Sequence, residues 1–100
     1  MAGTLNLEAD VAELTRVICD IESVSGNEAA LADAIEAALR KYSHLEVIRD
    51  GDAVVARTNQ NKGSRVVIAG HIDTVPVANN LPVQMLSMER EQVLYGRGTV

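Results

Sequence analysis

The sequence predicts an α/β fold in which two helices pack on a mixed β-sheet. Three observations predict it: helical periodicity in the first forty residues, short strand-like segments from Leu45 onward, and a continuous apolar run at Val66–Ala69. Such a run suits a central strand that is covered on both faces. A chain of 100 residues, 47% of them hydrophobic, is long enough for one small domain with a single core. We therefore treat residues 1–100 as one unit.

The first helix is expected over residues 7–22, with Asn6 as its N-cap. Apolar residues recur there at helical spacing: Leu7, Val11, Leu14, Ile18 and Ile21. A second helix is expected after Ser25, because Ser25 followed three residues later by Glu28 resembles a capping box. Its apolar stripe consists of Leu31, Ile35, Ala38, Leu39 and Tyr42. Two helices that precede any strand suggest one layer of a helix–sheet sandwich.

The remaining elements are expected to be strands. Residues 45–49 and 53–57 flank Asp50-Gly51-Asp52, a sequence typical of a hairpin turn. Two more short strands are predicted at residues 85–88 and 93–95, around a polar turn at Glu89–Glu91. Together with the central run, these segments would supply the predicted sheet.

Composition excludes several classes of function. The formal charge of −5 and nine scattered basic residues argue against a nucleic-acid partner. No run approaches the roughly 20 apolar residues of a membrane span, and no secretory leader is recognisable, so a cytoplasmic protein is expected. Cys19 is the single cysteine, which excludes an internal disulfide and suits a reducing compartment.

The segment after the predicted central strand carries the candidate chemistry. His71 follows Gly70, and a neutral imidazole at the end of a strand is a good ligand for a divalent transition metal. Asp73 lies two residues further on, where an extended backbone would turn it to the same side. It could bind the same metal, or accept the other ring N–H of His71. The alternative is an incidental His-x-Asp loop, and His44 is only a weak second candidate, expected at the protein surface.

Three strings in order resemble the co-catalytic zinc deacylase and aminopeptidase family. They are Ile21–Glu28 after the first helix, Gly70–Pro76 after the buried run, and Leu94–Val100 about twenty residues later. Within that family, the sequence around His71 is most similar to members that hydrolyse N-succinyl-LL-2,6-diaminopimelate to succinate and LL-diaminopimelate. One departure is Glu22, which stands where the family often has proline.

The resemblance implies roles for two residues of this chain. His71 would bind one of two zinc ions, with cobalt as a possible substitute, and Asp73 would be a catalytic-site residue that hydrogen-bonds His71 and fixes its tautomer. The family places a metal-bridging aspartate immediately beyond Val100. The chain is therefore expected to be the N-terminal portion of a zinc-peptidase-like catalytic domain, truncated before that aspartate. It would be inactive alone.

The resemblance also implies a small-molecule substrate and a homodimeric full-length protein that binds neither nucleic acid nor membrane. Two other readings remain open. The full-length protein could be another deacylase or peptidase of the same family, such as an acetylornithine deacetylase-like enzyme. The chain could instead be a non-catalytic small α/β binding module whose His-x-Asp loop has no metal role.

Overall fold

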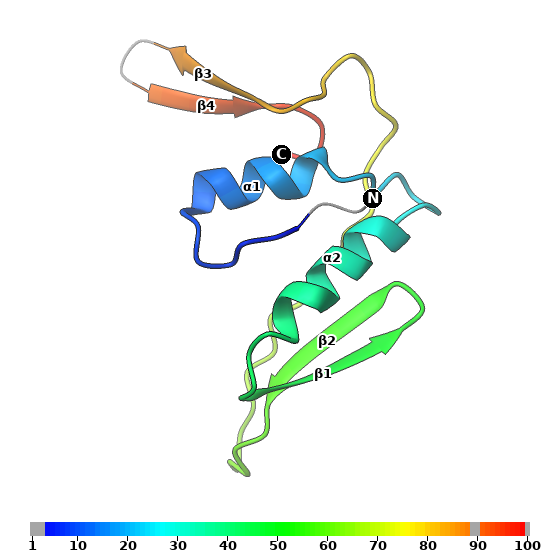
Figure 1. Cartoon of the computed structure of the whole chain (residues 1–100), viewed down its shortest axis with the longest axis vertical. Helices are drawn as coiled ribbons and strands as arrows, with labels where there is room; N and C mark the ends of the chain where they lie inside the picture. The colour runs from blue at the N-terminus through cyan, green and yellow to red at the C-terminus, as the bar shows by residue number, and fades with distance from the viewer. Residues whose placement is uncertain (1–3, 89–90, 100) are drawn as a thin grey trace.

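A computed structural model describes residues 4–88 and 91–99 and confirms the α/β class (Figure 1). Its elements are α1 (Val11–Asp20), α2 (Ala29–Leu39), β1 (Leu45–Asp50), β2 (Ala53–Thr58), β3 (Gln84–Met88) and β4 (Glu91–Tyr95). The described strands form two separate antiparallel pairs, β1–β2 and β3–β4, where the sequence predicted one mixed sheet. Glu89 and Arg90 of the predicted turn lie outside the described residues, whereas Glu91, also predicted to lie in the turn, is the first residue of β4.

Helix α1 is shorter than the predicted helix because a second capping residue takes over its start. The side chain of Asn6 accepts a hydrogen bond from the Glu8 amide at 3.0 Å and holds a turn that precedes the helix. Asp10 is the actual N-cap, since its carboxylate accepts from the Glu13 amide at 2.9 Å. The prediction of Asn6 as the cap was therefore wrong.

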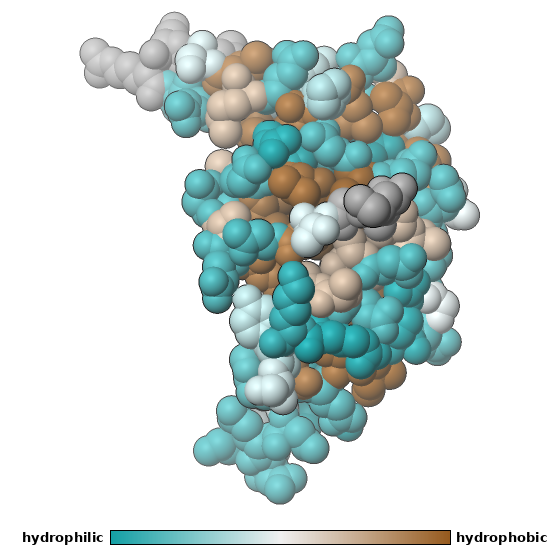
Figure 2. Space-filling view, in the orientation of Figure 1, coloured by the Kyte–Doolittle hydropathy of each residue, from teal (hydrophilic) through white to brown (hydrophobic). Residues whose placement is uncertain are grey.

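Helix α2 begins without the predicted capping box. Glu28 occupies the N-cap position in a helical conformation and makes no side-chain capping bond, while its carboxylate accepts from the Gly26 amide instead. The buried face of α2 meets α1 and the N-terminal segment in the core, whose buried residues are Leu5, Ile21, Leu31, Ala34 and Ala38. Figure 2 shows apolar side chains gathered between the two helices. In the described part of the chain, neither helix is long and apolar enough to cross a bilayer.

The β1–β2 hairpin is confirmed and lies against α2 (Figure 1). Leu45 pairs with Thr58 and Asp50 with Ala53, so the connecting turn has two residues. Gly51 is the first of them and has φ +58°, a conformation that favours glycine. Arg49 ties the hairpin to α2 through Asp33 at 2.9 Å and Glu36 at 3.0 Å.

The β3–β4 hairpin, also predicted, is joined to the end of α1 at its base. The Val83 amide donates to the Asp20 carboxylate at 2.7 Å. On the other strand, a Cβ at Gly96 would lie 2.7 Å from a methyl group of Val83 and 3.0 Å from the carbonyl of Asn80. Only glycine fits at this close approach. The hairpin therefore delivers the residues after β4 to the C-terminal end of α1.

The prediction of a central strand at Val66–Ala69 was wrong for the described residues. The segment has no regular secondary structure and pairs with no described strand, and Val66, Val67 and Ile68 are 90%, 76% and 96% exposed. A central strand requires hydrogen-bonding partners on both edges. Here each described strand pairs with only one neighbour, β1 with β2 and β3 with β4, and none of them pairs with this segment. The apolar run alone carries no information about which strands are present to pair with it and cover it.

Candidate metal-binding site

His71 and Asp73 meet as the spacing predicts. The Nδ1 atom of His71 lies 3.0 Å from Oδ1 of Asp73 and 3.1 Å from the Asp73 carbonyl oxygen. Both oxygens are acceptors when the carboxylate is ionised, so the ring proton belongs on Nδ1. The lone pair is then on Nε2, and the His71 side chain is 84% exposed. This is the tautomer and the exposure that a metal-binding imidazole needs.

The described residues supply one strong metal ligand and not a complete site. Among residues 4–88 and 91–99, no group of three or more His, Cys, Asp or Glu side chains is placed to hold a metal ion. A catalytic zinc site needs at least three protein ligands. The donor chemistry of His71 therefore fits one position in a metal's coordination sphere. His44 is exposed, and its ring meets the edge of Tyr42 with the ring centroids 6.0 Å apart.

The residue after Asp73 is clamped to the segment that follows α1. The Thr74 amide donates to the Ser23 carbonyl at 2.8 Å, and the Thr74 carbonyl accepts from the Ser25 amide at 3.1 Å. These bonds form a parallel bridge between Thr74 and Val24. The Ser23 and Thr74 hydroxyls lie 3.1 Å apart, and Ser23 is buried. Ser25 was expected to cap the second helix, whereas here it and Ser23 hold the loop that carries His71.

Arg97 is a buried residue of this region that sequence reasoning missed. It is 2% exposed, and its Nη2 donates to the carbonyls of Cys19 at 3.3 Å and Ile21 at 3.2 Å. Its Nη1 lies 3.4 Å from a carboxylate oxygen of Glu22. The one available signal was Gly96-Arg97-Gly98, a charged residue between two glycines directly after a predicted strand.

The carboxylate of Glu22 links the α1 end to Arg97. Its Oε1 accepts from the Val24 amide at 3.0 Å, and this bond, helped by Arg97, lowers the pKa of Glu22 below its ordinary value. A carboxyl whose pKa is depressed by folding contributes stability above its unfolded pKa. That stability is lost as the pH falls through the folded value.

We expect Glu22→Gln to flatten the acid limb of the stability curve. The wild-type chain should lose melting temperature as the pH falls below about 4.5, the ordinary pKa of a glutamate, and through the lower folded value. The variant should lose less, because the amide has no proton to gain. Thermal denaturation at several pH values measures this, with Glu8→Gln, an exposed carboxylate on the N-terminal segment, as the control. Parallel curves for wild type and Glu22→Gln would contradict the assignment.

His71 and Asp73 border a hollow among the described residues. Its volume is about 900 Å³, and it is lined by the α1 end, the Ser23–Ser25 segment, the His71 loop and Gly98, with apolar side chains from α1 and α2. Cys19 also lines it, and burial raises the pKa of its thiol, which favours the neutral form. The hollow thus combines an apolar floor with an exposed imidazole at its edge.

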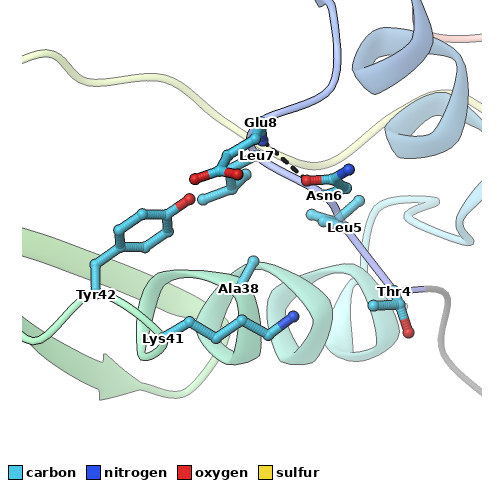
Figure 3. Close-up of a pocket in the computed structure, with 8 residues that line it drawn as sticks. All are labelled: Thr4, Leu5, Asn6, Leu7, Glu8, Ala38, Lys41 and Tyr42. Atoms are coloured by element: carbon cyan, nitrogen blue, oxygen red, sulfur yellow. Dashed lines mark hydrogen bonds between the residues drawn. The ribbon is translucent and has the colours of Figure 1, made fainter.

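A second hollow, of about 330 Å³, lies between the N-terminal segment and the end of α2 (Figure 3). Figure 3 shows Glu8, Lys41 and Tyr42 around it, with the Asn6–Glu8 turn on one side. It contains neither histidine nor cysteine among its described lining residues, so it is not the candidate metal site.

Comparison with known proteins gives these residues a context. No family model matches the chain. A succinyl-diaminopimelate desuccinylase of Corynebacterium glutamicum is 48% identical over 98 residues, and a Mycobacterium tuberculosis protein named for the same activity is 52% identical over 95 residues. This chain is similar in sequence to succinyl-diaminopimelate desuccinylases. The similarity covers 94–96% of the chain.

The chain spans 26% of the length of these desuccinylases. A more distant relative is a Thermococcus kodakarensis protein named as a LysW-lysine/LysW-ornithine hydrolase, which is 32% identical over 89 residues. That match covers 88% of this chain and 24% of the relative. The segment shared with the desuccinylases thus includes the His71 loop and the α1 end that clamps it.

Proposed function

We propose that the full-length protein containing this chain hydrolyses the amide of N-succinyl-LL-2,6-diaminopimelate to succinate and LL-diaminopimelate. The observation that carries this proposal is the identity of about one residue in two with desuccinylases over nearly the whole chain. The contact between His71 and Asp73 supports it, since it prepares one imidazole for metal binding. The product would serve lysine and cell-wall synthesis.

The chemistry follows from the family resemblance and from the described side chains. Zinc, when bound, supplies a water of lowered pKa and polarises the scissile carbonyl. His71 would hold one ion through Nε2, while Asp73 accepts a hydrogen bond from Nδ1–H and keeps the ring from rotating. The Thr74 bridge would keep this pair at the edge of the hollow. The other ligands and the general base would come from residues outside this chain.

We also propose two metal ions per active site, with cobalt able to replace zinc, a homodimeric full-length protein and a cytoplasmic location. These proposals rest on the family resemblance. The acidic balance of the chain supports the absence of a nucleic-acid partner.

The test is hydrolysis by the full-length protein with zinc added and with a chelator. We expect turnover of N-succinyl-LL-2,6-diaminopimelate that chelation abolishes and zinc restores. The 100-residue chain alone should show no turnover and should bind zinc weakly, because one histidine cannot make a closed site. A tight stoichiometric zinc site in the chain, or chelator-resistant turnover by the full-length protein, would overturn the proposal.

A second candidate is another deacylase or peptidase activity. Three of the similar proteins favour it: the LysW-lysine/LysW-ornithine hydrolase and two fungal proteins named as probable carboxypeptidases, each of the two 31% identical to this chain. Acetylornithine and a short peptide should therefore be assayed beside the succinyl substrate. A higher kcat/KM for either one would favour this alternative.

A further inference from the structure

Arg97 carries a buried positive charge that the proposed chemistry does not use. Its side chain is withdrawn from solvent, and its Nε has no acceptor among the described residues. Burial of an unpaired charge is strongly unfavourable, so a guanidinium persists in such a place only where acceptors surround it. Two backbone carbonyls and one carboxylate supply them.

The carbonyls belong to the C-terminal end of α1. Ile21 is the C-cap of that helix, and the last turn contains no basic residue of its own. The exposed carbonyls of a helix end carry partial negative charge and are stabilised by a cation. Arg97 provides that cation from a position more than seventy residues away in the sequence. It therefore holds the chain where α1 turns into the Ser23–Ser25 segment.

A short series of bonds connects this point to His71. The segment that Arg97 holds continues into Ser23 and Ser25, which bond the Thr74 backbone. Thr74 directly follows Asp73, and Asp73 bonds the imidazole. The loop of Arg97 also touches this series directly, since a Cβ at Gly98 would lie 3.4 Å from a methyl group of Thr74. Movement of the α1 end would therefore move the support of the His71 loop.

We propose that Arg97 is a positioning residue for His71, acting by fixing the α1 end and the Ser23–Ser25 segment that clamp Thr74. The metal-binding consequence rests on the proposed function. A guanidinium suits the role because its planar fork reaches both carbonyls and Glu22 together, whereas a lysine ammonium is a single compact point. Without the guanidinium, the hydrogen bonds between Thr74 and the Ser23–Ser25 segment would be formed only part of the time.

The test compares Arg97→Gln and Arg97→Lys in the full-length protein, with two readouts. The first is hydrogen exchange at the Ser25 and Thr74 amides, and the second is the zinc dissociation constant. For Arg97→Gln we expect exchange at least about tenfold faster at both amides and zinc affinity weaker by about 10- to 100-fold, the usual effect of losing support for a ligand. Arg97→Lys should fall between Arg97→Gln and wild type.

Two controls separate positioning from general destabilisation. Arg57→Gln removes an exposed arginine that pairs with Glu46 on the β1–β2 hairpin, and it should change neither readout. Ala37→Gly weakens α2 at an exposed position, outside the core cluster that contains Ile21. The proposal is overturned if Arg97→Gln exchanges at Thr74 no faster than Ala37→Gly does at matched stability, or if its zinc affinity equals that of wild type.

The outcomes also distinguish this inference from the proposed function. If wild type binds no zinc that depends on His71, the proposed function fails, while amide exchange still reports whether Arg97 holds the clamp. If Arg97→Gln does not fold, Arg97→Lys and Glu22→Gln provide the comparison. Each of them weakens the contacts of the guanidinium while leaving a polar side chain in place. Unchanged Thr74 exchange in both would overturn the inference.

Discussion

Replacing His71 by alanine in the full-length protein is expected to abolish amide hydrolysis. The imidazole is exposed and has its Nδ1 proton held by Asp73, so Nε2 is the atom that would bind metal. Loss of a metal ligand removes the polarisation of the carbonyl and the activation of water. Those effects stabilise the transition state by several kcal/mol. A loss of about 4 kcal/mol of this stabilisation lowers kcat/KM by about a thousandfold. Metal content should fall in parallel.

The matched control is His44→Ala, which removes the other histidine of this chain. His44 is exposed and contacts the ring of Tyr42, away from the His71 loop, so zinc content and turnover should remain at wild-type values. Zinc analysis and initial rates on the same preparations measure both quantities. Normal zinc occupancy and rate in His71→Ala would exclude this residue as a ligand.

Replacing Asp73 by alanine is expected to leave metal binding possible but weak. The imidazole would keep its place in the loop, yet the proton on Nδ1 would lose its carboxylate partner at 3.0 Å. Ring orientation and basicity would then be less well defined, which costs about 10- to 100-fold in metal affinity. At saturating zinc, kcat should still be below the wild-type value.

The Asp73 experiment needs a carboxylate control of equal exposure and no contact with histidine. Asp52 serves, because it lies in the β1–β2 turn and pairs with Arg49 at 3.5 Å. Asp52→Ala should leave the zinc dissociation constant unchanged, as measured by competition with a chelator. Equal affinities for Asp73→Ala and wild type would show that the carboxylate does not support the ligand.

Local patterns predicted the parts of the fold that depend on neighbouring residues. The helices and both hairpins were found because their signals are short in range: apolar spacing, turn residues and alternation. The start of α1 was misplaced because Asn6 and Asp10 are both good capping residues, and the competition between them is decided by the turn before the helix. The Val66–Ala69 run failed as a central strand because strand pairing depends on segments distant in sequence.

In the candidate site, too, contacts between residues close in sequence were predicted and contacts between distant residues were not. His71 and Asp73 are two residues apart, and a spacing of two residues was enough to predict their contact. Ser23 and Arg97 were missed as parts of the site, because their partners lie far away along the chain and no short motif announces such a contact. The sequence showed Glu22 only as a departure from the family's usual proline. The structure gives it a role, because its carboxylate lies beside the guanidinium of Arg97.

The clamp around Thr74 has a consequence for the order in which this chain folds. The Ser23–Thr74 contact closes a loop of 51 residues, and Arg97 reaches back 75 residues to Glu22. Closing such loops costs entropy that is recovered only when the last contacts form, whereas hairpins and helices form within microseconds. The two hairpins and both helices are therefore expected early, and the support of His71 last. Metal-binding competence would then report completion of folding rather than its beginning.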